Sequence, residues 1–416
     1  MQKSLMLLVK QHILPLTLLL FSVFSSPVLA QHDPDPIQKG EQGRSHDEHL
    51  PEGDIVKEEY DAAATTMHHL GDSYSFDLWK QDGHYVGFQF PRIFFDQKTN
   101  QLRFFLTTTR AKEAGYIDPH DFHGLHRYTK DVKHGFLMTP SAHGELQELE
   151  EQVEAGTLAG EEAELQLDNL IREYGPWDFS ITKNVFFMLI TALLMLLIFG
   201  SMGKRYKSNP NRAPKGVSSF FEPIVVFIRD DIGKNYIPHQ YERFMPLLCT
   251  MFFFIWFLNM FGLVPFGANV TGNISVTLAL ALITLVITNI NGTKTYWGHI
   301  FWFPGVPLPV KFLMMIVEVI GIFTKPFALM VRLFANITAG HVIILSLIGL
   351  IFILGEMGAN PAAGWGVSIL STVFVLFIDL LELFVALLQA YVFTLLSAVF
   401  IGQALEDHTH HEEAAH

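Results

Sequence analysis

Ionisable residues recur at fixed intervals inside two long apolar stretches of this 416-residue chain. In the first stretch, Glu318, Lys325 and Arg332 follow one another at intervals of seven residues. Seven residues make two helical turns with a drift of only about 20°, so the three side chains form one polar stripe on an apolar helix. In the second stretch, Glu382 and Gln389 are also seven residues apart. Both stretches therefore present polar groups at depths where a bilayer would otherwise meet only apolar side chains.

The types of these residues indicate proton or ion movement. Arg332 cannot give up its proton, so in a low-dielectric setting it is a permanent positive charge that attracts a carboxylate and repels mobile protons. His341 and Glu382 both take and release protons, as a relay between water and a buried site requires. A static pair between two helices is the alternative for His341 and Glu382. For Glu318 and Asp379, a structural role and a functional role are equally open.

These residues are positioned by two helices that form a hairpin. The stretches Val310–Leu354 and Val367–Leu405 are about twice the length of roughly twenty residues that crosses a bilayer. They must be tilted, kinked or partly outside the hydrocarbon. Between them, Gly355–Pro361 carries strong turn residues, which predicts an antiparallel helical hairpin. Folding at this turn places Arg332 opposite Gln389, Glu318 opposite Gln403, and His341 near Glu382.

Three further apolar segments bring the predicted spans to five: Val185–Met202, Phe244–Phe266 and Ile274–Ile290. Lys204 and Arg205 follow the first of these at once, which indicates a cytoplasmic exit. The segment Phe220–Tyr236 mixes apolar and charged residues at helical spacing and is expected to lie along the inner membrane surface.

The connecting segments agree with this orientation. The predicted inner loop, 291–310, contains Lys294, whereas the predicted outer connections, 267–272 and 355–366, contain no Lys or Arg. The C-terminal tail, 406–416, is therefore expected in the cytoplasm.

The N-terminal region has a different character. Residues 1–30 combine Lys3 and Lys10 with an apolar run and end in Val-Leu-Ala, as a secretory signal peptide does; an uncleaved membrane anchor is the alternative. Residues 31–175 hold 28 acidic against 13 basic residues and no basic patch with interleaved aromatics, which argues against nucleic acid as a partner. Aromatic and β-branched runs at 74–79, 85–90, 92–95 and 102–109, then an acidic helix over 145–173 broken near Gly156 and Gly160, predict a small soluble α+β domain.

Two segments of the membrane region are recognisable. Lys325-Pro326, followed by Val331-Arg332-Leu333-Phe334-Ala335-Asn336-Ile337-Thr338-Ala339-Gly340-His341, closely resembles the signature helix of the F-type ATP synthase a subunit. Leu387-Leu388-Gln389-Ala390-Tyr391-Val392-Phe393 resembles the last helix of that family. The similarity extends more loosely through 256–259 and 262–265, and covers the chain from about Asp178 to its end.

The resemblance implies a role for each of the polar residues. Arg332 matches the family's essential arginine, which faces the ring of c subunits, and Gln389 matches the glutamine near it. Asn336 matches the asparagine one turn on, and Glu318 matches a half-channel carboxylate. Some bacterial members have a glutamate at the place of His341 and a histidine at that of Glu382, so this chain resembles an exchanged arrangement that keeps one acid and one imidazole.

The sequence as a whole therefore predicts a membrane all-α protein. Five transmembrane helices, including a long tilted helical hairpin, make up residues 176–405 and follow the small soluble α+β domain, which is extracytoplasmic. By the resemblance, the chain is the non-enzymatic, proton-translocating stator subunit of an ATP synthase in the bacterial inner membrane. It provides two half-channels at the c ring, needs no cofactor or metal, and assembles with the c-subunit ring, the b subunits and other synthase subunits in the lipid bilayer.

Two alternatives come from other classes. Intramembrane charges are equally normal in an independent secondary transporter or ion channel, although five spans show no internal repeat. His120, His123 and His126, with the His-rich tail 408–416, suggest a metal-binding exported protein with a membrane anchor. Pro119 and Gly124 favour a loop there, which makes solvated histidines the simpler interpretation.

Overall fold

The computed structural model describes residues 72–81, 84–125, 128–129, 132, 135–208, 215–237, 240–264, 267–302, 307–354 and 361–405. The predicted signal peptide, the segment 31–64 and the His-rich tail lie outside the described residues. The chain divides into two compact units. The described part of one unit consists of residues 184–340 and 380–405, and that of the other consists of residues 72–183 and 341–379.

Short antiparallel strands form where the sequence predicted them. β1 (Ser75–Gln81) pairs with β2 (His84–Gln89). β3 (Arg92–Asp96) is the centre of a second sheet, in which it pairs with β4 (Gln101–Phe105) on one edge and with β5 (Trp177–Asp178) on the other. The alternation of buried and less buried residues along β3 shows that one face of this sheet is the core face.

Three α-helices lie between β4 and β5 in the described chain: α4 (Thr108–Glu113), α5 (His143–Glu154) and α6 (Glu161–Tyr174). The predicted break in the acidic helix is confirmed, since Gly156 and Gly160 adopt φ of 69° and 65° between α5 and α6. The predicted strand 102–109 is wrong beyond Phe105. There the Thr107 hydroxyl accepts a hydrogen bond from the backbone N–H of Arg110 at 3.2 Å and begins α4 as an N-cap.

A buried arginine ties the sheet together. The Arg92 side chain is fully buried, donates to the carbonyl of Gly135 at 2.9 Å and pairs with the Asp178 carboxylate at 3.4 Å. Its guanidinium also stacks 3.6 Å from the centre of the Tyr74 ring. Burial, and then the Asp178 carboxylate, raise the pKa of Tyr74 well above its ordinary value. Arg92 thus joins β3, β5 and the segment before β1.

Replacing Arg92 with alanine is expected to destabilise this unit by about 3 to 5 kcal/mol, because the Asp178 carboxylate would be left without its buried partner. The effect is measurable in the full chain as faster hydrogen exchange of the β3 and β5 amides. Arg110→Ala is the matched control, since Arg110 is an exposed residue of α4. Equal exchange in the two variants would show that Arg92 does not hold the sheet.

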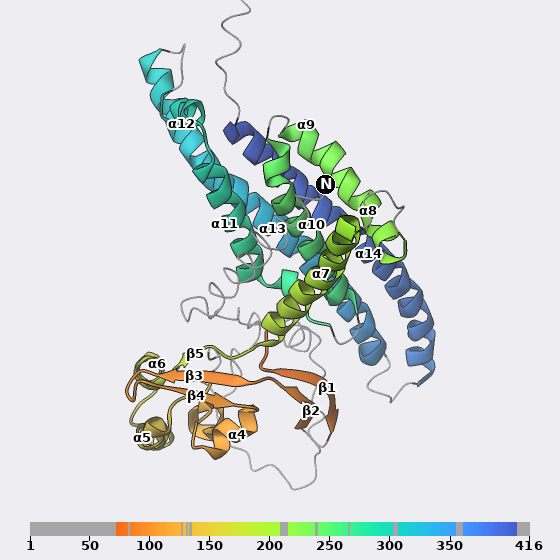
Figure 1. The fold of residues 1–416 in the computed structure, drawn as a ribbon. Helices are drawn as coiled ribbons and strands as arrows, with labels where there is room; N and C mark the ends of the chain where they lie inside the picture. The colour runs from red at the N-terminus through yellow and green to blue at the C-terminus, as the bar shows by residue number, and fades with distance from the viewer. Residues whose placement is uncertain are drawn as a thin grey trace, which may run out of the picture. The chain divides into compact units, whose positions relative to one another are not determined.

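The unit built from 184–340 and 380–405 packs around one mostly buried helix, α10 (Tyr241–Leu263). Its buried cluster takes residues from α7 (Lys183–Ser208), α11 (Ile274–Ile290), α13 (Leu308–Leu354) and α14 (Pro361–Leu405). Figure 1 shows α7, α10 and α11 beside the second half of α14. The bounds of α11 are those the sequence predicted.

The described residues contain four helices that are long and apolar enough to cross a membrane, or up to five if a bent pair counts as one span. The bent pair is α11 with α12 (Lys294–Phe301), which meet at 104°. The sequence predicted a loop at α12. The structure has a helix there because the Thr293 hydroxyl accepts a hydrogen bond from the N–H of Tyr296 at 3.2 Å. The predicted span 274–290 thus counts as a fifth spanning helix only together with α12.

The segment predicted on the inner membrane surface is helical throughout. α8 (Val217–Phe227) continues into a π-helical turn, Ile228–Gly233, and then α9 (Lys234–Tyr236). Asp230 accepts two hydrogen bonds from Arg229 and pairs with Lys234 at 2.7 Å. These bonds, first from Arg229 and then from Lys234, lower the pKa of Asp230. The charged turn is therefore internally neutralised.

Candidate functional site

The outward face of α13 carries an isolated charge. Arg332 is exposed and makes no ion pair within the part of the chain that the structure describes. Asn336, one turn later, is exposed too, and the exposed neighbours Phe327 and Val331 are apolar. An arginine on an apolar face is available to a partner that brings a negative charge, because nothing in the described chain neutralises it.

Two of the predicted polar residues of α14, Glu382 and Gln389, are buried, whereas Asp379 and Gln403 are exposed. Glu382 and Gln389 are only 6% and 5% exposed. Further along α14, the packed face includes many small side chains that let helices approach closely, beside the buried Phe393 and Ile401. These buried small residues are Ala386, Ala390, Thr394, Ser397, Ala398 and Ala404. The second half of α14 is therefore held tightly in the core, with Glu382 at the beginning of this packed part.

Asn259 of α10 fixes α14 at the level of these residues. Its amide nitrogen donates to the carbonyl of Ala386 at 3.1 Å, and its amide oxygen accepts from the Thr271 hydroxyl at 2.8 Å. Ala386 lies between Glu382 and Gln389 on α14. Asn259 is thus a positioning residue. The sequence showed it only as part of a loose family similarity, and its contact could not be predicted because its partner is 127 residues away in the chain.

Replacing Asn259 with leucine is expected to lower the stability of the α10–α14 contact by about 1 to 3 kcal/mol, since the Thr271 hydroxyl and the Ala386 carbonyl lose their buried partner. Thermal inactivation of the membrane complex would show the loss as a lower Tm. Asn235→Leu is the matched control, because Asn235 is exposed and bonds only within its own helical segment. An unchanged Tm for Asn259→Leu would show that Asn259 does not help to hold α14 in place.

The two helices of the hairpin meet closely at Gly340 of α13. A Cβ added to Gly340 would collide with the carboxylate of Glu382, so only glycine leaves room for that side chain here. This contact lies one residue from the predicted level of His341 and Glu382. His341 is half-buried and begins the 341–379 part of the other unit, so its pairing with Glu382 stays a prediction.

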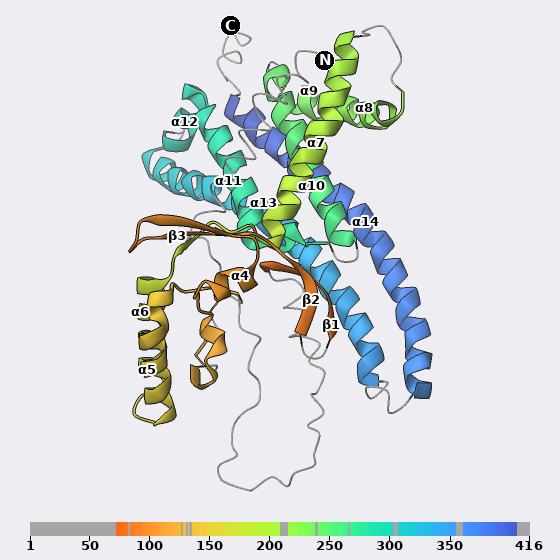
Figure 2. The same ribbon diagram turned by 60° about the horizontal axis from the view of Figure 1, so that its bottom comes forward.

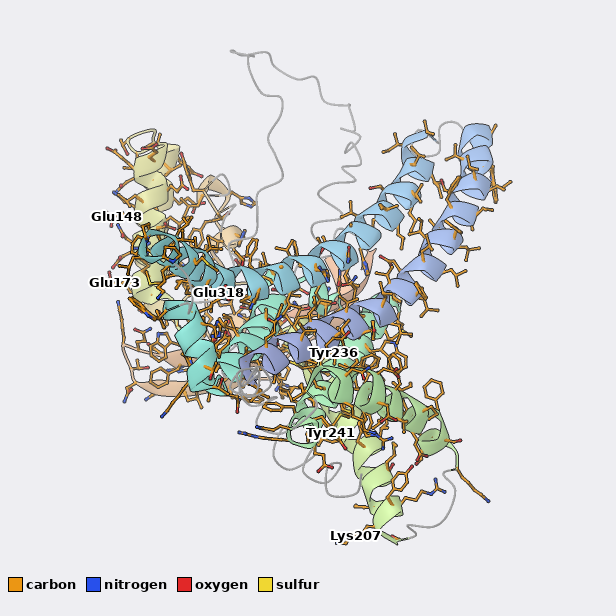
Figure 3. The ribbon with its side chains drawn as sticks, turned by 90° about the horizontal axis from the view of Figure 1, so that it is seen from above. Glu148, Glu173, Lys207, Tyr236, Tyr241 and Glu318 are labelled. Carbon is orange, nitrogen blue, oxygen red and sulfur yellow. The ribbon has the colours of Figure 1, made fainter. Side chains whose placement is uncertain are left out.

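In the polar stripe of α13, Gln403 of α14 contacts a different residue from the predicted one. The sequence placed Glu318 opposite Gln403, but the Gln403 amide oxygen accepts a hydrogen bond from Lys325 at 3.4 Å. The long side chains of lysine and glutamine reach along the helix axes, past the residue directly opposite. Glu318 is exposed on the N-terminal part of α13, where Figure 3 labels it.

A small cavity with a mostly apolar surface adjoins Lys325. Its volume is about 10 Å³, which is about the space that one water molecule needs. Its polar lining consists of Thr284, Thr288, Asn289, Tyr296 and Lys325. The buried hydroxyl of Thr288 has no hydrogen-bond partner among the described residues. The cavity can therefore hold a water molecule between α11, α12 and α13.

The described residues contain no group of three or more His, Cys, Asp or Glu side chains placed to hold a metal ion. His120 instead contacts the Asp118 carboxylate at 2.9 Å, and Lys112 pairs with Asp118 and Asp121. His126 and the His-rich tail lie outside the described residues. The metal-binding alternative thus has no support in this part of the chain.

Comparison with known proteins identifies the membrane region. A protein-family model described as ATP synthase A chain matches residues 185–402. "ATP synthase subunit a" of Chloroherpeton thalassium is 48% identical over 246 residues, which are 58% of this chain and 72% of that protein. The protein of the same name from Chlorobium phaeobacteroides (strain BS1) is 48% identical over 249 residues, covering 58% and 71% of the two chains. "ATP synthase subunit a 2" of Prosthecochloris aestuarii is 46% identical over 248 residues, covering 58% and 74%.

Proposed function

Since this chain belongs to the ATP synthase A chain family and is a proton-translocating stator subunit of the membrane sector, we propose that it moves protons through two half-channels at its interface with a ring of c subunits. Family membership sets aside the independent transporter. The chain is a multi-pass membrane protein that assembles with other ATP synthase subunits.

The observation that carries the proposed mechanism is the exposed, unneutralised Arg332 on the apolar face of α13. A carboxylate of the ring that has lost its proton would be attracted to this charge, and a proton would be repelled from it. Arg332 thus holds the ring carboxylate in its ionised form between the two half-channels and blocks a direct leak. Asn336 is on the same exposed face and would meet the ring beside it.

The buried residues of the hairpin then serve the half-channels. Glu382, with His341, passes protons between water and the ring, and Gln389 lies near Arg332 at the ring-facing level. Glu318, exposed on α13, and the cavity beside Lys325 belong to the second half-channel. The Thr288 hydroxyl and the Lys325 side chain at this cavity support a water site on that route, because both can hydrogen-bond to water.

We propose the following arrangement of the chain in the membrane. Residues 1–30 direct the chain to the bacterial inner membrane, and residues 31–175 form a soluble domain outside the cytoplasm. Five spans within 176–405 bring the tail, 406–416, to the cytoplasm, and the c ring and the b subunits are the immediate partners. The chain itself has no catalytic role and requires no cofactor. Loop charge and the apolar lengths of the helices support this topology.

Thiol cross-linking tests whether the exposed face of α13 meets the ring. Cysteine at Asn336, which is exposed, is expected to form disulfides with cysteines introduced along the outer helix of the c subunit. Cysteine at Leu333 is the control, since that side chain is 1% exposed. Cross-links at neither position, in a complex that still assembles, would place the ring on another face.

A further inference from the structure

The three-stranded sheet of residues 72–183 has a second face of apolar side chains that is partly exposed. Directly opposed residues of neighbouring strands point to the same side of a sheet. Ile93 is opposite Phe104, while Phe95 is opposite both Leu102 and Trp177. With Phe179, whose ring is 6.5 Å from that of Trp177, they form an apolar sheet face that consists of Ile93, Phe95, Leu102, Phe104, Trp177 and Phe179.

This apolar sheet face is unusually exposed for such side chains. Leu102 is 67% exposed, Phe104 60% and Trp177 44%. The opposite face holds the buried Arg92, Phe94 and Asp96. Figure 2 shows α4, α5 and α6 on one side of the sheet only. A contiguous exposed patch of aromatic and aliphatic side chains marks an interaction surface rather than ordinary protein surface.

The chain after β5 runs without interruption from the sheet to the first described candidate span. Backbone hydrogen bonds continue along the sheet beyond β5, from Phe179 to Ile93, from Ile181 to Pro91 and from Lys183 to Ser73. Lys183 is also the first residue of α7, the first described candidate span. No free linker therefore separates the sheet from the membrane helix. Even a fully extended chain from Trp177 to Lys183 would reach only about 20 Å.

Charge distribution favours lipid as the occupant. The six residues of the apolar sheet face carry no charge, whereas the acidic residues of this unit gather on α5 and α6. Glu148 and Glu173 are labelled on these helices in Figure 3. Tryptophan and other aromatic residues are the side chains that prefer the interface between lipid and water. A sheet with one aromatic face and an acidic opposite side therefore suits the surface of a bilayer.

We propose that the apolar sheet face rests on the interfacial region of the membrane leaflet at which α7 begins. The sheet then acts as a second, peripheral anchor that fixes residues 72–183 against the bilayer. This assignment rests only on α7 being a membrane span, and it is independent of the proton path through α13 and α14.

The test places a fluorescent label on adjacent residues of β4 that point to opposite faces of the sheet. Full-length chain carrying Cys249→Ala, so that no native thiol remains, is reconstituted into phosphatidylcholine nanodiscs with Leu102→Cys or with Gln101→Cys as the matched control. Both positions are exposed, so neither substitution is expected to disturb the fold. Brominated phosphatidylcholine reports contact with lipid, and iodide reports contact with water.

The label at Leu102 is expected to be quenched by brominated lipid at least twofold more than the label at Gln101, with the opposite order for iodide. A third label, at Glu148 on α5, should respond to iodide alone. Equal quenching of the Leu102 and Gln101 labels would overturn the proposal. So would protection of Leu102 from iodide without quenching by brominated lipid, because another protein or a second copy of this chain would then cover the face.

Discussion

ATP-driven proton pumping is expected to fall by about 1,000-fold when Arg332 is replaced by alanine. A ring carboxylate 4 Å from the guanidinium would gain about 4 kcal/mol at the effective dielectric constant of about 20 that suits sites near a protein surface. That energy corresponds to about three powers of ten in the population of the ionised carboxylate. Since Arg332 is exposed and has no ion pair within the described residues, its removal is not expected to unfold the subunit.

Inverted membrane vesicles and a pH-sensitive dye measure this effect. Co-purification of the other synthase subunits must first show that the complex assembles. Arg243→Ala is the matched control, because Arg243 is an exposed arginine at the start of α10. Full pumping by an assembled Arg332→Ala complex would mean that this charge has no part in coupling.

Replacing Glu382 with glutamine is expected to lower pumping by about 100-fold or more, the usual contribution of a positioned acid or base. Glutamine has nearly the same shape, so the close contact with Gly340 can be kept while the ability to carry a proton is lost. Pumping rates at several pH values measure the effect, since Glu382→Asp should retain a pH-dependent fraction of the activity.

Gly340→Ala separates the position of Glu382 from its chemistry. The added methyl group must displace the carboxylate, so a partial loss of pumping is expected even though the acid remains. If Glu382→Gln pumped normally while Gly340→Ala did not, Glu382 would be a packing residue and the proposed relay would be wrong.

Long apolar periodicity made most helices predictable from the sequence. The ends of α11 agree to the residue, and α7, α10, α13 and α14 differ from the predicted segments by a few residues. The short helices α4 and α12 were missed because neither depends on an apolar pattern. Each begins at a threonine hydroxyl that caps the backbone, at Thr107 and Thr293.

The spacing of the polar residues along the sequence identified them, but it did not predict which side chains surround them or whether they are buried. Spacing alone put Glu318, Lys325 and Arg332 on one stripe, whereas the structure turns Lys325 to Gln403 and leaves the other two exposed. The contacts of Asn259 and Gly340 could not be predicted either. Both depend on the exact approach of α14, which is fixed by side-chain packing between segments far apart in the chain.

Passive proton flux distinguishes a charge barrier from a merely broken channel. Vesicles stripped of the catalytic sector and energised by a potassium diffusion potential would carry wild-type chain or Arg332→Ala, with the membrane sector assembled in both. The proposed mechanism predicts that the variant loses ATP-driven pumping yet conducts protons passively at least as fast as wild type, because both half-channels remain while the barrier between them is gone. Loss of passive flux together with pumping would contradict it, since Arg332 would then be needed to build the proton path rather than to guard it.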